Sequence, residues 1–450
     1  MKRIKDNGLL FSDRRLFKLI WPLMTEQLLS VLVGMIDVLM VAYVGEATVS
    51  GVSLMDSFNN LVIQVLFAMT AGGTVVCARY CGAKDESGAS RVGGQLLMLT
   101  TIATLVLSAI FFLGGRGLLS ALFGSVEPEV MSNAVTYMLY TAASYPFLAI
   151  YHASASVFRA RGNTRLSMLV SLGMNLTNIA GNALCVFGLG MGVEGVAIPT
   201  LISRAAAAVI MFIFLQSKKN PLRIRDPRQF RPDGKMLRQI LSIGVPNSIE
   251  SGLFNLGKVM LQSLVSTLGT ASIAAFAVSG NLVMYLYLPG NALGAGLITV
   301  VGQCNGAGVP EQARYYVKRF LAINYGILLV LSSLMALTRG GLVGFYSLTP
   351  EAASFAEGLV LSHTIAMLIW PLAFLIPYYY RAMGHATFTM IIALTSMAFF
   401  RIGTAYLFIN VMHRDVLWIW YAMFIDWIFR SLVFGAAFFR KKIIGKKERK

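Results

Sequence analysis

Twelve long apolar segments follow one another along this chain, and they constrain its fold more than any other feature. Each is long enough to cross a membrane as a helix, which takes about 20 residues. Charged residues make up only 13% of the 450, about half the share found in an average soluble domain. The sequence therefore predicts an all-α membrane protein with twelve transmembrane helices. Their expected bounds are 15–44, 50–78, 92–114, 131–157, 165–189, 194–216, 239–268, 274–302, 315–338, 353–380, 386–411 and 416–439.

The net charge is +18, and the Lys and Arg residues that produce it are distributed as expected for a membrane protein of fixed orientation. With both termini in the cytoplasm, 31 of the 38 Lys and Arg residues fall in cytoplasmic ends and loops, as the positive-inside rule requires. We therefore expect a multi-pass protein of the inner (plasma) membrane, with the lipid bilayer rather than nucleic acid as its charged partner. The tail RKKIIGKKERK fits a membrane surface, and the leading MKRIKDN is expected to precede an uncleaved anchor. We expect a monomer.

The chain also repeats itself. A shift of 224 residues matches Pro22 with Pro246, Glu26 with Glu250, Gly45 with Gly269 and Gly82 with Gly306, and a shift of 222 matches Arg159 with Arg381. Two six-helix bundles, each with an even number of spans, share one orientation, so a pseudo-two-fold axis along the membrane normal relates them. This is a plan of secondary transporters that places the binding site between the halves. We expect an N-terminal lobe at 1–216, a basic cytoplasmic linker at 217–238 and a C-terminal lobe at 239–450.

One carboxylate stands out within the first span. Asp37 lies in an apolar run with no other charge between Glu26 and Glu46, although a charge at mid-membrane costs at least about 2.5–3.5 kcal/mol. It lies 11 positions after Glu26, which places the two within about 20° of each other on one helix face, together with Ser30. A buried Asp satisfied by neighbouring donors is the structural alternative. We favour a functional role because no basic residue flanks Asp37 on this helix.

The fifth span carries Asn175, Asn178 and Asn182 on one face. Their amides either supply oxygen ligands to a cation and donors to a carboxylate, or form hydrogen bonds between helices. In the seventh span, Glu250 precedes Lys258 by two turns. These two either neutralise each other or Glu250 binds substrate, and Glu26, Asn175 and Lys258 are the further candidates for substrate binding.

Three other intramembrane bases have simpler expected roles. Asp426 and Arg430 are four residues apart and predict a structural ion pair on one helix. For Arg204 and Arg401 we expect snorkelling to head groups or contacts with carbonyls.

Over essentially its whole length the chain resembles the multidrug and toxic compound extrusion (MATE) transporters. The resemblance rests on the twelve spans in two parallel halves and on motifs whose order and spacing are specific. These are WPLMTEQLLSVLVGMIDVLMVAYVG in the first span, GAK after the second, FRARGNTR after the fourth, and NIAGNALCVFGLGMGVEGVAIPT across the fifth and sixth.

The resemblance implies site residues. In one branch of the family, an Asp of the first span works with an Asn-x-x-x-Asp pair in the fifth and a Thr in the sixth. Those positions match Asp37, Asn178, Asn182 and Thr200, which become the candidate cation-coupling residues; the first three are the metal ligands if the ion is sodium. Asn182 stands where that branch has Asp, so the site has one charge fewer. Another branch pairs a Glu matched by Glu250 with an Asp of the tenth span, and MLIWPLAFLIPYYYRAMG has none.

The function implied is secondary active antiport: export of cationic, amphipathic organic compounds in exchange for protons or sodium ions by alternating access. No enzyme activity and no cofactor beyond the transported ion are expected. The first alternative is a lipid-linked precursor flippase of the same superfamily, which usually has a strongly cationic cavity, whereas intramembrane acids slightly outnumber bases here. A membrane-embedded enzyme is the second alternative, although the sequence has neither a paired Asp motif nor HExxH.

Overall fold

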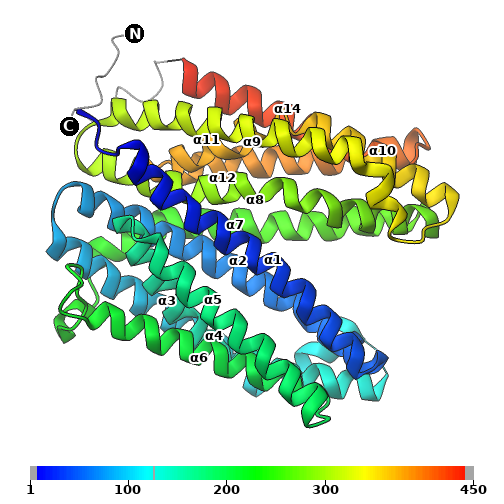
Figure 1. Ribbon diagram of the computed structural model, residues 1–450, viewed down its shortest axis with the longest axis horizontal. Coiled ribbons are helices and arrows are strands. Elements are labelled where there is room, and N and C mark those ends of the chain that lie inside the picture. The colour runs from blue at the N-terminus through cyan, green and yellow to red at the C-terminus, as the bar shows by residue number, and fades with distance from the viewer. Residues whose placement is uncertain (1–7, 125–126, 441–450) are drawn as a thin grey trace. The chain divides into compact units, whose positions relative to one another are not determined.

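The structure, a computed structural model, describes residues 8–124 and 127–440, with backbone alone at 38, 42, 57 and 121–123. The leading MKRIKDN and all but the first residue of the basic tail lie outside these residues, so their expected roles stay predictions. Every regular element of the described residues is helical (Figure 1). In the first half these are α1 (Asp13–Val44), α2 (Glu46–Gly82), α3 (Glu86–Phe123), α4 (Pro128–Arg161), α5 (Thr164–Ala183) with its π-helical extension η2 (Leu184–Gly188), and α6 (Glu194–Gln216).

The second half continues the pattern after a short 3₁₀ turn, η3 (Pro227–Phe230). Its helices are α7 (Gly234–Ser266), α8 (Thr270–Gly306), α9 (Pro310–Gly344), α10 (Pro350–Ala366), α11 (Trp370–Ala382), the continuous run α12 (Ala386–Thr395), η4 (Ser396–Gly403), α13 (Thr404–Tyr406) and η5 (Leu407–Val411), and α14 (Leu417–Phe439). With α10 and α11 taken as one bent span and α12 to η5 as one run, these are the twelve predicted helices. By length and apolar composition alone, nine helices of the described residues qualify as membrane spans, or ten with the bent pair.

The bend in the tenth span was not predicted. A break of three residues separates α10 from α11, and their axes differ by 53°. Pro371 stands in the first turn of α11, where its missing N–H costs nothing but where it cannot continue a preceding helix. One expected segment, 353–380, is therefore two helices.

In each half, a glycine lies at the tight connection between the first helix and the second. Gly45 alone separates α1 from α2, and its φ of 138° lies in the region that side chains disfavour. Gly269 takes the equivalent place before α8 with a φ of 88°. The backbone therefore explains why the repeat matches these two glycines.

Pro22 lies inside α1 without breaking it. A proline removes the hydrogen bond to the carbonyl four residues earlier, here that of Lys18. The hydroxyl of Thr164, the first residue of α5, donates to the carbonyls of Lys18 at 3.4 Å and Leu19 at 2.9 Å. A neighbouring helix thus satisfies the backbone that the proline frees, as membrane helices require.

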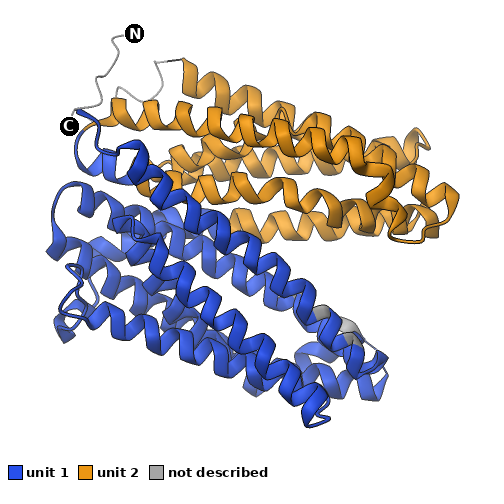
Figure 2. Cartoon of the chain, in the orientation of Figure 1, with its two compact units in different colours: residues 1–248, 302–308 blue, residues 249–301, 309–450 orange. Residues whose placement is uncertain are grey.

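The chain forms two compact units (Figure 2). The first comprises 1–248 and 302–308, and the second comprises 249–301 and 309–450. The division differs from the expected lobes because three segments belong to the first unit: the linker, the N-terminal part of α7 up to residue 248, and the C-terminal end of α8 from residue 302. Gln95 of α3 illustrates this, since its side-chain nitrogen donates to the linker carbonyls of Gln229 at 2.9 Å and Arg231 at 2.7 Å.

Two glycines matched by the repeat permit a close helix crossing inside the first unit. A methyl group on Gly82 of α2 would lie 2.0 Å from the Gln303 carbonyl oxygen, and one on Gly306 of α8 would lie 1.8 Å from that of Arg79. The contact is reciprocal, because each glycine faces the backbone three residues before the other. Any side chain at either position would separate the two helices.

Candidate cation site and charge pairs

Asp37 lies in a network of amides rather than against a base. The side-chain nitrogen of Asn182, which is fully buried on α5, donates to Asp37 Oδ1 at 3.0 Å. The ion pairs among the described residues, defined by N–O distances up to 4.0 Å, do not include Asp37. The structure therefore brings together Asp37 and the amide face that the sequence singled out.

Asn178 links this network to α6. With its nitrogen toward Asp37, the Asn178 amide donates to Oδ1 at 3.1 Å and Oδ2 at 3.3 Å, and its oxygen accepts from the Thr200 hydroxyl at 3.0 Å. Turned over, its nitrogen donates to Thr200 and its oxygen accepts from Asn182 at 3.4 Å. The four expected cation-coupling residues thus form one cluster built from α1, α5 and α6.

This cluster forms part of the wall of a cavity of about 390 Å³ inside the first unit. Ser30 and Asn175, both singled out from the sequence, also line it. Two further charged residues line the cavity: Asp56 on α2 and Arg204 on α6. For Arg204 we expected snorkelling to head groups or a contact with a carbonyl, and the structure shows another partner: Nη1 donates to the Ser144 hydroxyl at 2.7 Å within the unit.

Glu26 and Glu250 are held in equivalent ion pairs. Arg159 Nη2 lies 2.5 Å from Glu26 Oε1, and Arg381 Nη2 lies 2.6 Å from Glu250 Oε1. In each case the arginine Nε also donates to a hydroxyl early in the next helix, Ser167 at 3.5 Å and Thr389 at 3.4 Å respectively. Of the two alternatives for Glu250, its pairing with Lys258 is therefore wrong, because Arg381 takes that place.

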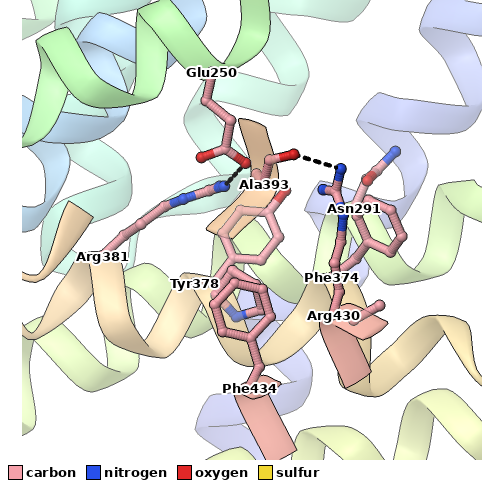
Figure 3. Close-up of a pocket in the computed structure, with 10 residues that line it drawn as sticks. Glu250, Asn291, Phe374, Tyr378, Arg381, Ala393, Arg430 and Phe434 are labelled. Atoms are coloured by element: carbon pink, nitrogen blue, oxygen red, sulfur yellow. Dashed lines mark hydrogen bonds and ion pairs between the residues drawn. The ribbon is translucent and has the colours of Figure 1, made fainter. Parts of the chain in front are cut away.

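A small pocket of about 60 Å³ in the second unit contains this second pair (Figure 3). Glu250 faces Arg381 across the pocket, and Arg430 donates to the Ala393 carbonyl at 3.0 Å. The predicted ion pair of Asp426 with Arg430 is confirmed at 2.7 Å.

Lys258 and Arg401 both lie beside the ring of Phe254, a neighbour that was expected for neither. The Lys258 ammonium is 5.1 Å from the centre of the Phe254 ring, and the Arg401 guanidinium is 5.2 Å from the same ring. Arg401 is 7% exposed and lies 3.8 Å from Asp426 Oδ2, so the prediction of a snorkelling or carbonyl contact missed its carboxylate neighbour.

Sequence reasoning missed both arginine partners and the cavity role of Arg204 and Asp56. One signal pointed to the partners: the repeat preserves the glutamates and the arginines together, as Glu26 with Glu250 and Arg159 with Arg381. The positions matched by shifts of 224 and 222 do not include Arg204, so the repeat as compared did not place it in the cavity.

The fold and the site together define a class: a multi-pass membrane transporter built from two repeated helical halves. The MatE family model matches residues 22–184 and 246–407. These segments begin 224 residues apart, the same shift that the sequence repeat showed. The chain belongs to the MatE family, whose members are transporters and not enzymes.

Relatives agree over most of the chain. It is 26% identical over 397 residues to the uncharacterized transporter YisQ of Bacillus subtilis, which covers 87% of each chain. It is 24% identical over 445 residues to the probable multidrug resistance protein NorM of Thermotoga maritima, covering 97% of this chain and 95% of that one. A solved MOP superfamily transporter from Pyrococcus furiosus has the same fold, with a TM-score of 0.89 at 19% identity over 97% and 98% of the two chains. These matches do not favour the flippase or enzyme alternatives.

Proposed function

We propose that this protein is a secondary active antiporter that exports cationic, amphipathic organic compounds in exchange for protons or sodium ions. The observation that carries the proposal is Asp37, a carboxylate in the wall of a 390 Å³ cavity with amide neighbours and, among the described residues, no basic group within 4.0 Å. A charge in such a place is costly unless a cation neutralises it. A mobile cation is the partner that this arrangement leaves open.

The oxygen atoms around Asp37 could bind either a proton or a sodium ion. Carboxylate and amide oxygens are ligands for a hard cation, and the buried Asn182 Oδ1 has no hydrogen-bond donor among the described residues. The Asn178 amide, turned over, would present its oxygen to Asp37 in place of its nitrogen. With its nitrogen toward Asp37, the Asn178 amide stabilises the ionised carboxylate while its oxygen accepts from Thr200.

Antiport follows if binding of the ion at the Asp37 cluster and binding of the drug exclude each other. Binding of an ion from outside neutralises the Asp37 cluster, favours rearrangement of α1 around Pro22 and releases the drug; reopening inward releases the ion. The two halves would alternate between outward and inward access, as repeat transporters do. Both termini would be cytoplasmic in this scheme.

The cargo assignment rests on relatives and on the first-unit cavity, which two carboxylates, Asp37 and Asp56, line together with one base, Arg204. NorM of Thermotoga maritima is described as a probable multidrug resistance protein. We propose that Asn175, which lines the cavity with Asp37, contacts cargo. For Glu26 and Glu250, their ion pairs with Arg159 and Arg381 support a structural role in place of the substrate contact expected from sequence.

The test is efflux from liposomes that contain the purified protein. A fluorescent cationic drug is followed under a pH gradient alone and then under a sodium gradient alone. We expect at least one gradient to drive efflux, and Asp37→Asn to abolish it while the variant still inserts and elutes as the wild type does. Gradient-driven efflux retained by Asp37→Asn would reject the coupling role.

A further inference from the structure

The first-unit cavity contains two acids and one base that do not form an ion pair. Its titratable lining side chains are Asp37 on α1, Asp56 on α2, Tyr137 on α4 and Arg204 on α6, while α5 contributes amides. Within residues 8–124 and 127–440, Arg204 lies within 4.0 Å of no carboxylate. With Tyr137 neutral and the other three groups ionised, the cavity carries one net negative charge.

Each charged group except Asp37 is fixed to the wall by a hydroxyl of α4. Arg204 Nη1 donates to Ser144 Oγ at 2.7 Å, and the Tyr137 hydroxyl donates to Asp56 Oδ1 at 3.4 Å. Ser144 in turn donates to the Thr141 carbonyl at 2.6 Å, so the anchor of Arg204 is itself held by α4. The guanidinium is therefore a tethered charge, placed in the cavity without occupying the oxygens of Asp37.

The charges of the cavity must balance, and this requirement defines the role of Arg204. Two carboxylates in a membrane-embedded cavity would require two positive charges, and a divalent ion could supply both. Arg204 supplies one permanently, because a guanidinium stays protonated. One charge is left for an exchangeable ion.

We propose that Arg204 is a built-in counter-cation that balances Asp56 and thereby restricts the Asp37 site to one exchangeable monovalent cation. The inference rests on the proposed function, since it assumes that an ion exchanges at Asp37. It adds two residues, Arg204 and Asp56, that determine ion affinity and ion valence without contacting the ion.

The inference predicts opposite effects for the two charges. Arg204→Gln leaves a net charge of −2 and should bind the cation at least about tenfold more tightly, because a unit charge at cavity distances is weakly screened there. The same variant should admit calcium, which the wild type should exclude. Asp56→Asn leaves the cavity neutral and should weaken cation binding at least about tenfold. The double variant restores one negative charge and should return close to wild-type affinity.

Two measurements on the purified full-length protein cover both possible ions. Binding of ²²Na⁺, with calcium chloride as competitor, reports sodium. The infrared band of a protonated carboxyl group, recorded against pH without sodium, reports protons; a tenfold change in affinity moves its midpoint by about one pH unit, upward for Arg204→Gln and downward for Asp56→Asn. Arg204→Lys keeps the charge and should keep the affinity. Arg116→Gln, an exposed base on α3 that does not line the cavity, is the matched control.

The outcomes separate this inference from the proposed function. If Asp37→Asn retains whichever ion signal the wild type gives, the proposed function fails. If Asp37→Asn loses that signal but Arg204→Gln binds within about twofold of the wild type and still excludes calcium, the inference alone is overturned. Should Arg204→Gln not fold, Asp56→Asn decides, and unchanged affinity in that variant overturns the inference.

Discussion

Arg159 contacts Glu26 across 133 residues of sequence, and this ion pair of 2.5 Å ties α1 to α4 in the first unit. The second unit repeats it with Arg381 and Glu250, which are 131 residues apart. Both pairs are largely buried, with side-chain exposures between 11% and 16%. In each pair, the glutamate lies one turn after the proline of its helix: Glu26 follows Pro22 on α1, and Glu250 follows Pro246 on α7. The pairs therefore hold the segment of each half that a proline has weakened.

Removing either glutamate charge should destabilise the protein. Glu26→Gln and Glu250→Gln are each expected to lower the free energy of unfolding by about 3 kcal/mol, because breaking a buried pair costs more than the pair contributes. The measurement is thermal unfolding of the purified variants in detergent. Glu351→Gln removes an exposed carboxylate from the first turn of α10 and is the control. Unfolding midpoints that match this control would show that the pairs contribute nothing to stability.

Glu250→Gln also tests whether this carboxylate recognises cargo. Its ion pair with Arg381 leads us to expect equal loss of efflux for cationic and neutral compounds, measured on the same liposomes. A selective loss of cationic compounds would restore the substrate-binding role that the sequence suggested.

Asn182 tests the oxygen cluster directly. Asn182→Asp adds a second carboxylate beside Asp37, and we expect about tenfold tighter sodium binding from the added charge. Asn182→Leu removes the amide that donates to Asp37 at 3.0 Å and should abolish ion-driven efflux. Titration of efflux with sodium measures both effects. If Asn182→Asp leaves the sodium dependence of a sodium-driven wild type unchanged, Asn182 does not belong to the ion site.

The glycine crossing of α2 and α8 gives a prediction about folding. Gly306→Ala would place a methyl group 1.8 Å from a backbone carbonyl oxygen that cannot turn away. We expect a loss of at least about 3 kcal/mol, the upper end for overpacking, seen as a lower yield of monodisperse protein. Gly280→Ala on the same helix meets open space and should behave as the wild type does. Equal yields for the two variants would mean that the helices separate at no cost.

Much of this arrangement could be predicted because its physical causes are local. The length of each apolar run predicts a helix that spans a membrane, and the helical period places Asp37, Glu26 and Ser30 on one face. The repeat predicts two related halves, and the match of Gly45 with Gly269 follows from a backbone conformation that glycine adopts readily. The same reasoning predicted the Asp426–Arg430 pair, because both residues lie on one helix.

The sequence by itself thus determined the helices, the repeat and the candidate residues around Asp37. Only the tertiary structure decided which charges meet: Glu250 pairs with Arg381 rather than with its near neighbour Lys258, and Arg204 turns into the cavity rather than toward a head group. The physical reason is that a charge in a low-dielectric interior takes the partner that the packing of distant helices brings near. That packing depends on long-range contacts, such as the close approach at Gly82 and Gly306, which no single helix specifies.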